Sequence, residues 1–243
     1  MNKVFVLVLT AGLLSIASST FAEAPPASDR NLILTDGMAE LMGQNDSAKL
    51  SIAVVTEGKN LEEVSSENAS KTKGVLTAIK DLNVKNLNLK TSSYRVTPQR
   101  DYKARPPKIK GYEVYNAVEA RLEGFEPDRL SRHVSGIIEK ALGSGANRVD
   151  HVQFYIENKL PLEKKALTEA TQEAMERART LAEAAGVKLK RIASLSTQPI
   201  HMPSEAHMFR AAEMKDDAGG VAPPIEVGES KIRVQVSIAY EIE

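Results

Sequence analysis

Imidazole and thioether side chains gather in one stretch near the C-terminal end, and they have the clearest potential for chemistry. Soft thioether ligands together with imidazole suit copper, and exposed methionines also react reversibly with oxidants. Their spacing matches no fixed metal motif, so copper binding and sacrificial oxidation stand as alternatives to a plain surface loop, which we expect. The candidates for this metal- or oxidant-handling function are His201, Met202, His207, Met208 and Met214.

The rest of the chain contains no catalytic constellation. It has no cysteine, GxSxG elbow, P-loop, GxGxxG or HExxH motif. The glycine-rich GSGAN at residues 143–147 follows a predicted helix, whereas a phosphate cradle opens into one, so a helix cap and turn are expected. His133 falls in a predicted helix, and Asp150 and His151 are strand neighbours that should point to opposite faces. We therefore predict no enzyme activity, no catalytic residue and no cofactor.

Four polar residues fall on otherwise apolar helical stripes and raise the hypothesis of a polar pocket beneath the helices. The alternative is that each bonds to a neighbouring backbone group, as buried polar groups normally do, and this is the outcome we expect. The residues are Ser65, Asn68, Thr72 and Thr171.

The first 22 residues have the layout of a cleaved secretory signal. Lys3 precedes an apolar run from Val4 to Leu14, and small residues lead to Ala22, after which cleavage is expected. The apolar run is too short for a convincing membrane span. We expect a flexible N-terminus over residues 23–30 and no stable membrane insertion after cleavage.

The charge balance of the mature chain excludes one class of partner. Removing Lys3 leaves 31 basic against 32 acidic side chains, and the chain has no tryptophan. Nucleic-acid binding requires a basic excess with interleaved aromatic side chains, so we predict no nucleic-acid partner. Any small-molecule ligand is unknown.

Alternation with period two predicts three strands, of which Lys231–Glu243 is the clearest. An antiparallel sheet with one covered face is the natural interpretation. If Lys231–Glu243 lies at a sheet edge, it could pair with another subunit. The other two strands lie within Leu50–Glu57 and Gly111–Leu122.

Helical periodicity predicts three amphipathic helices. Asn83 and Gly143 are the expected caps of the first two, and Gly186 caps the third. The third carries an alanine seam that should let it lie close on a sheet, with Leu167 and Leu181 on the same stripe and Glu173 and Arg177 facing outward. The helices are expected at Leu61–Ile79, Pro127–Leu142 and Ala166–Ala185, and the seam is Ala170, Ala174, Ala178, Ala182 and Ala185.

The elements together predict an α+β fold in which about three helices pack on antiparallel sheet. Strand, helix and strand follow one another twice, with the second strands within Asp81–Pro98 and Ala184–Pro199. This order indicates either a duplicated unit or two similar plans that arose independently. The basic stretch Gln99–Lys110 is expected to be a loop, and Pro199–Ser230 a long irregular connection that is partly helical around Ala206–Met214.

Five blocks follow one another along the chain: TSSYRVTP, IKGYEVYNAVEARL, GSGANRVDHVQFYIEN, EATQEAMERARTLAEAAGVKL and PPIEVGESKIRVQVSIAYEIE. In this order they resemble the SIMPL-domain family, whose members include periplasmic oxidative-stress-defence and immunogenic proteins of Gram-negative bacteria. The resemblance implies one domain over residues 31–243 with an irregular loop at 200–229, location in the periplasm, a protective role and homo-oligomers. It implies no catalytic residues. Gly37 stands alone where relatives carry a more glycine-rich turn, so the first hairpin is left open.

Overall fold

The structure is a computed structural model that describes residues 31–200 and 225–243, and Leu32–Glu243 form one compact unit. The predicted signal peptide, the N-terminus at 23–30 and the expected helix at Ala206–Met214 lie outside the described residues, and so does most of the loop 200–229. They stay predictions.

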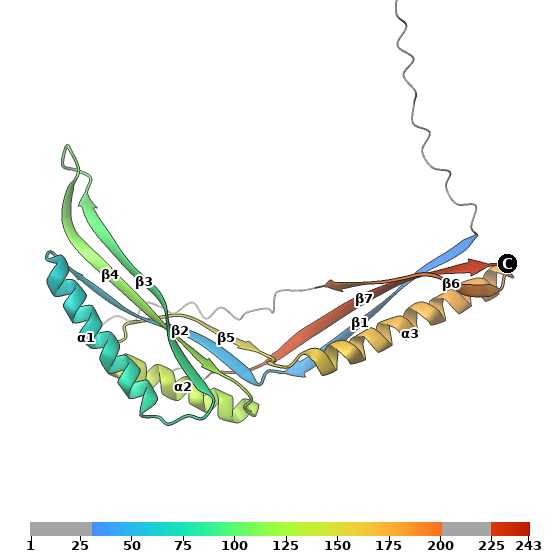
Figure 1. The fold of residues 1–243 in the computed structure, drawn as a ribbon, viewed down its shortest axis with the longest axis horizontal. Helices are drawn as coiled ribbons and strands as arrows, with labels where there is room; N and C mark the ends of the chain where they lie inside the picture. The colour runs from blue at the N-terminus through green and yellow to red at the C-terminus, as the bar shows by residue number, and fades with distance from the viewer. Residues whose placement is uncertain (1–30, 201–224) are drawn as a thin grey trace, which may run out of the picture. The chain divides into compact units, whose positions relative to one another are not determined.

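Two antiparallel sheets and three helices make up the described part of the chain, which confirms the α+β prediction (Figure 1). One sheet has the strand order β3-β4-β2-β5 and the other β1-β7-β6. None of the described helices is long and apolar enough to cross a membrane. The elements are β1 (Leu32–Gln44), β2 (Ser47–Gly58), α1 (Leu61–Lys80), β3 (Leu87–Asp101), β4 (Lys108–Leu122), α2 (Pro127–Gly143), β5 (Arg148–Tyr155), α3 (Leu160–Ala185), β6 (Leu189–Ile200) and β7 (Glu229–Ile242).

The four-stranded sheet carries α1 and α2 on one face, and large aliphatic side chains fill the space between them. Strand residues such as Leu50 and Ile52 alternate inward with period two, while Ile79 and Ile137 come from the helices, and all four are almost fully buried. Burying such side chains stabilises the fold by roughly 1.5–3 kcal/mol each. The packing of this sheet against α1 and α2 therefore depends on large aliphatic side chains.

The three-stranded sheet carries α3, and its core is built differently. The helix contributes alanines at every fourth position, and β7 contributes the inward face that its period predicted. Gly186 follows the last residue of α3 in the left-handed conformation, and its N–H donates to the carbonyl oxygens of Ala182 and Glu183. This confirms the predicted cap. The buried alanines are Ala166, Ala170, Ala174, Ala178 and Ala182, and the β7 face is Ile232, Val234, Val236, Ile238 and Tyr240.

Gly37 on β1 explains why the helix face must be small. A β-carbon at this position would lie 1.9 Å from the Ala170 carbonyl oxygen and 2.5 Å from the Ala174 nitrogen. The Thr35 hydroxyl donates to the Ala174 carbonyl oxygen at 2.8 Å. The backbones of strand and helix are thus in direct contact.

The predicted seam was wrong at its ends. Ala185, Leu167 and Leu181 are exposed, although they fit a straight stripe, and Ala166 is buried instead. Residues spaced by four form a ridge inclined to the helix axis, and the contact with the sheet follows that ridge. The helix also begins six residues before Ala166, at Leu160.

Three predictions about strands need correction. β7 is central, between β1 and β6, so the hypothesis that it offers an open edge was wrong. β1 forms no hairpin with β2: it pairs with β7, while β2 pairs with β4 and β5 in the other sheet. The strands β3 and β4 extend into the predicted loop, so that residues 102–107 alone connect them.

The repeated strand–helix–strand order does not give two equivalent units. β2 and β3 belong to one sheet, where both flank β4, whereas β5 and β6 lie in different sheets. The cap predictions for the first two helices were wrong by one or two residues. α1 ends at Lys80 with Asp81 as its cap, and Asn83 is left-handed two residues after that cap. Gly143 is still helical in α2, and Ser144 is the cap.

Candidate functional site

The predicted copper or oxidant ligands His201, Met202, His207, Met208 and Met214 lie outside the described residues. Within residues 31–200 and 225–243, no group of three or more His, Cys, Asp or Glu side chains could hold a metal ion. That hypothesis therefore stays a prediction, and the search for a site turns to the described surface.

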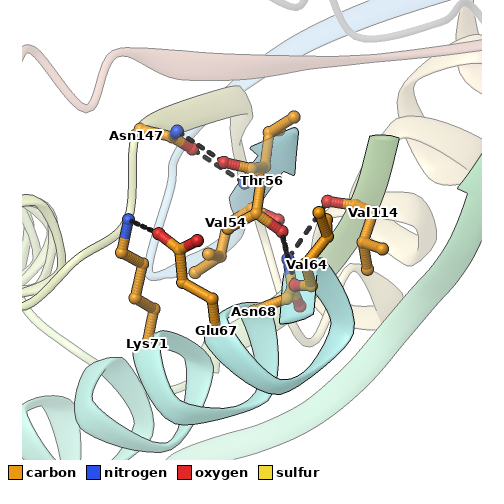
Figure 2. Close-up of polar contacts among 9 residues, drawn as sticks. Val54, Thr56, Val64, Glu67, Asn68, Lys71, Val114 and Asn147 are labelled. Atoms are coloured by element: carbon orange, nitrogen blue, oxygen red, sulfur yellow. Dashed lines mark hydrogen bonds and ion pairs between the residues drawn. The ribbon is translucent and has the colours of Figure 1, made fainter. Parts of the chain in front are cut away.

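The polar residues beneath α1 form a structural network (Figure 2). The fully buried Asn68 amide donates to the carbonyl oxygens of Val54 at 3.0 Å and Val114 at 3.1 Å, on neighbouring strands. Thr72 donates to the Asn68 side-chain oxygen at 3.4 Å. These bonds join α1 to β2 and β4, so the alternative of hydrogen bonds to neighbouring groups accounts for Asn68 better than a pocket does.

Of the other polar residues in this hypothesis, Thr171 serves local structure. Thr171 is half-buried and its hydroxyl donates to the Leu167 carbonyl oxygen at 2.7 Å, within its own helix. Ser65 is half-buried. The GSGAN stretch caps and turns as expected. The Asn147 side chain accepts from the Val55 N–H and donates to the Val55 carbonyl oxygen, both at 2.8 Å, and so extends the pairing with β2 to the residue before the start of β5.

His133 and His151 lie apart. His133 packs edge-on against Phe125, with ring centroids 5.0 Å apart. Burial lowers the pKa of His133, and the nearby Arg129 and Arg132 lower it further. His151 is exposed on β5. These environments indicate a packing role for His133 and assign no chemistry to His151.

A β-bulge at Asp150 overturns the expectation that Asp150 and His151 point to opposite faces. The ladder between β2 and β5 slips by one residue there, so His151 pairs with Ser51 while Asp150 is the extra residue. The Asp150 carboxylate accepts hydrogen bonds from the hydroxyls of Ser51 and Tyr115 and pairs with Arg148 at 2.7 Å. Since Ser51 shares a face with His151, both Asp150 and His151 serve the face away from the helices.

Tyr115 is the centre of a polar cluster on that face. Arg95 and Arg148 each lie 5.7 Å from the centroid of its ring, within range of cation–π attraction. Burial raises the pKa of Tyr115 to about 12, and the hydrogen bond to Asp150 adds to the shift. The phenol is therefore neutral at physiological pH and unsuited to act as a base.

A second polar cluster on the same face surrounds Glu119. Its buried carboxylate lies 3.0 Å from Lys49 Nζ and 3.1 Å from Lys90 Nζ. Burial alone would raise the pKa of Glu119, but the hydrogen bonds and charges of the two lysines outweigh it and lower the pKa. In both clusters the charged groups pair with one another across neighbouring strands, which stabilises this face of the sheet.

The two edges of the three-stranded sheet differ in whether their backbone groups have partners. At the β1 edge, the Glu173 carboxylate accepts from the Met38 N–H at 2.6 Å, and Arg177 donates to the Asp36 carbonyl at 2.8 Å. Glu173 and Arg177 also pair with each other at 2.5 Å. They were predicted to face outward, but they occupy the free hydrogen-bonding groups of β1 because α3 lies so close. We call these two residues the edge clamp.

At the opposite edge, β6 pairs with β7 and with no other described strand. Ile192 and Leu195 pair with Tyr240 and Ile238, so they share the face that α3 covers. They are nevertheless 42% and 57% exposed, respectively. An edge strand with exposed aliphatic side chains is a template for pairing with another chain. The β6 edge is therefore the candidate binding site of the described structure.

Sequence reasoning placed the open edge at β7 and missed β6 and the edge clamp. Leu189–Ile200 was correctly expected to contain a strand, but its place in the sheet follows from a pairing with residues about forty positions away. The signal in the sequence was Ile192 and Leu195 among polar residues, which is too weak to assign an edge.

Comparison with known proteins gives the family. The model described as "SIMPL: Protein of unknown function (DUF541)" matches residues 33–240. The 26 kDa periplasmic immunogenic proteins of Brucella melitensis biotype 1 and Brucella abortus strain S19 are each 27% identical over 219 residues, which cover 87% of this chain and 84% of the relative.

A solved structure described as AtUAH in complex with (S)-hydroxyglycine is 12% identical in sequence and has a TM-score of 0.25. The match covers 58% of this chain and 35% of the other chain, and a likeness this low indicates neither a shared fold nor a shared function. The family match spans both sheets and all three described helices, from β1 to β7. The chain belongs to the SIMPL family.

Proposed function

We propose that the chain is a non-enzymatic periplasmic protein that assembles with copies of itself through the β6 edge. The observation that carries this proposal is the contrast between the two edges of one sheet. β1 is closed by the edge clamp, whereas β6 has no described strand on its outer side and exposes Ile192 and Leu195. Antiparallel pairing of two β6 strands would extend the sheet across two subunits and bury these side chains.

The absence of enzyme activity is supported by the chemistry of the uncovered faces. The carboxylates of Asp150 and Glu119 are engaged by hydroxyls, lysines and arginines, and the Tyr115 phenol has a pKa of about 12. A general base near pH 7 would need the opposite arrangement, with a pKa close to the working pH. Binding is the function that such surfaces serve best.

Sedimentation velocity over a range of concentrations tests the assembly. Leu195→Lys places a charge at the proposed interface and should shift the mature chain toward monomer. Leu34→Lys is the matched control, because Leu34 is 72% exposed on the β1 edge strand. This control should leave the association unchanged. A wild-type protein that stays monomeric at high concentration, or two variants that associate like the wild type, would contradict the proposal.

Export and protection form the rest of the proposal. The relatives are named as periplasmic proteins, and the first 22 residues have the features of a cleavable signal. N-terminal sequencing of the protein from the periplasmic fraction should begin at Glu23.

For the protective role, a deletion strain should be more sensitive to peroxide, and a plasmid with the wild-type gene should restore tolerance. Equal tolerance of deletion and parent strains would remove the oxidative-stress role and leave the assembly untouched.

A further inference from the structure

The hairpin that joins β3 and β4 concentrates positive charge in a chain that is neutral as a whole. Between Gln99 and Lys110 there are five basic side chains and one acidic one, whereas the full sequence has 32 of each. A local excess of this size produces an attractive field for anions that the balance of the whole chain conceals. All five are exposed: Arg100, Lys103, Arg105, Lys108 and Lys110.

The same hairpin has an apolar face. Pairing of Val96 with Val114 and of Arg100 with Ile109 places Tyr94, Val96 and Ile109 on one side of the ladder. Val114 on that side is fully buried under the helix layer. On the edge strand β3, Tyr94 is 57% exposed, and nearer the tip Ile109 is 47% exposed. The apolar face of the sheet thus continues past its helical cover, and Figure 1 shows the hairpin running on beyond the end of α1.

The tip of the hairpin adds an aromatic side chain to the basic cluster. Tyr102 is 77% exposed and stands in the six-residue connection between the strands, next to Lys103. Tyrosine is favoured at membrane interfaces because its ring enters the apolar boundary while its hydroxyl stays hydrated. Lysine and arginine stems likewise cover apolar surface while their charged ends reach the headgroups.

We propose that the β3–β4 hairpin, from Tyr94 to Tyr112, docks the protein reversibly on a membrane surface that contains anionic lipids. Its charge complements the lipid headgroups, and the one-sided apolar row can enter the boundary between headgroups and acyl chains. Aliphatic side chains such as Val96 and Ile109 favour a lipid partner over nucleic acid, because phosphate contacts along a polyanion need no apolar row. The docking is peripheral and uses strands, and it is independent of assembly through β6.

Cosedimentation of the mature chain with vesicles tests this proposal. The probes are vesicles of phosphatidylcholine alone and of equimolar phosphatidylcholine and phosphatidylglycerol, at low and high salt. The chain should bind the anionic vesicles, with binding that falls as salt rises. The double variant Lys103→Gln, Arg105→Gln should bind on the order of 30-fold more weakly, since each basic residue near an anionic surface is worth roughly a factor of 5.

The matched control is Lys73→Gln, Lys164→Gln, which removes the same charge from exposed positions on α1 and α3. It should bind like the wild type. A third variant, Tyr102→Ser, Ile109→Ser, keeps the charge and should also weaken binding. All three change exposed side chains, and unchanged thermal unfolding will show that each is folded.

Four results of the vesicle experiments would overturn the proposal. They are no binding of the wild type to anionic vesicles, equal binding to neutral vesicles, equal loss in the tip and control double variants, and full binding by the Tyr102, Ile109 variant. Binding to a single-stranded oligonucleotide without binding to vesicles would assign the hairpin to a soluble polyanion and would likewise overturn it.

Discussion

The two sheets hold their helices by different means. On the four-stranded sheet, large side chains such as Ile79 and Ile137 fill the layer beneath α1 and α2, and Asn68 is the polar exception that bonds to two strands. On the three-stranded sheet, alanines and Gly37 bring the backbone of α3 against β1. The four-stranded sheet is therefore packed through large side chains, whereas the three-stranded sheet is packed through close contact between backbones.

This difference decides which strand edges are open. Because α3 lies so close to β1, its polar side chains reach the free backbone groups of that strand, and Glu173 and Arg177 close the edge. The cost is that the helix covers β1 and β7 and leaves Ile192 and Leu195 on β6 exposed. The close packing of α3 on β1 therefore leaves the β6 edge exposed, and the proposed assembly depends on that edge.

The largest effect should come from Gly37→Ala. The added carbon would lie 1.9 Å from the Ala170 carbonyl oxygen, which belongs to helix backbone and cannot rotate away. We expect a loss in the free energy of unfolding of about 3 kcal/mol or more, at or beyond the usual upper end of overpacking costs. Urea denaturation followed by circular dichroism measures it.

Gly136→Ala in α2 is the control for that prediction. A β-carbon there meets nothing within 4 Å. Because glycine is unfavourable within a helix, this variant should be neutral or stabilised by up to about 1 kcal/mol. A similar midpoint for both alanine variants would mean that α3 does not contact β1 at Gly37.

Ala174→Leu tests the same contact from the helix side. Ala174 is fully buried, and its nitrogen would lie 2.5 Å from a β-carbon on Gly37, so no space exists for a larger side chain. We expect a loss of about 2 to 3 kcal/mol through overpacking. Ala185→Leu on the exposed end of the same helix should change stability by less than about 0.5 kcal/mol. Equal midpoints for the two variants would mean that the helix is rotated from the described orientation.

Asn68→Leu addresses the four-stranded sheet. The leucine would remove the hydrogen bonds to the Val54 and Val114 carbonyl oxygens but add apolar surface to a core that already depends on bulk. We expect a loss of about 1 to 2 kcal/mol, since removing one partner leaves buried acceptors unsatisfied. Thr35→Val, which removes a single strand-to-helix bond, should cost less. A leucine variant as stable as the wild type would make Asn68 dispensable to packing.

Local periodicity explains what the sequence predicts well. The three helices and the alternating face of β7 follow from patterns within about twenty residues, where side-chain direction repeats with 3.6 or 2.0 residues per turn. The sequence also predicts that Asn68 is hydrogen-bonded, because an isolated amide on an apolar stripe must find partners. It does not show that these partners are carbonyl groups on two different strands.

Contacts between distant residues explain what the sequence could not show. β1 pairs with β7 about two hundred residues later, so neither the central place of β7 nor the open edge at β6 can be seen in a local pattern. One extra residue at Asp150 reverses the alternation on which the analysis of Asp150 and His151 relied. The basic stretch Gln99–Lys110 is visible in the sequence, but its place on two paired strands with an exposed apolar side follows from the register between β3 and β4.

The smallest effect on stability should come from the edge clamp. Glu173→Gln, Arg177→Gln removes an exposed ion pair, which is worth less than about 1 kcal/mol. Its effect on association should be larger, because the Asp36 carbonyl and the Met38 N–H lose their charged partners and β1 becomes a second open edge. Sedimentation velocity should then show species larger than those of the wild type. Lys165→Gln, Glu169→Gln removes another ion pair from the same helix and should leave the distribution unchanged. If both variants sediment like the wild type, the clamp is not what closes β1, and the contrast between the two edges must come from the close approach of the α3 backbone alone.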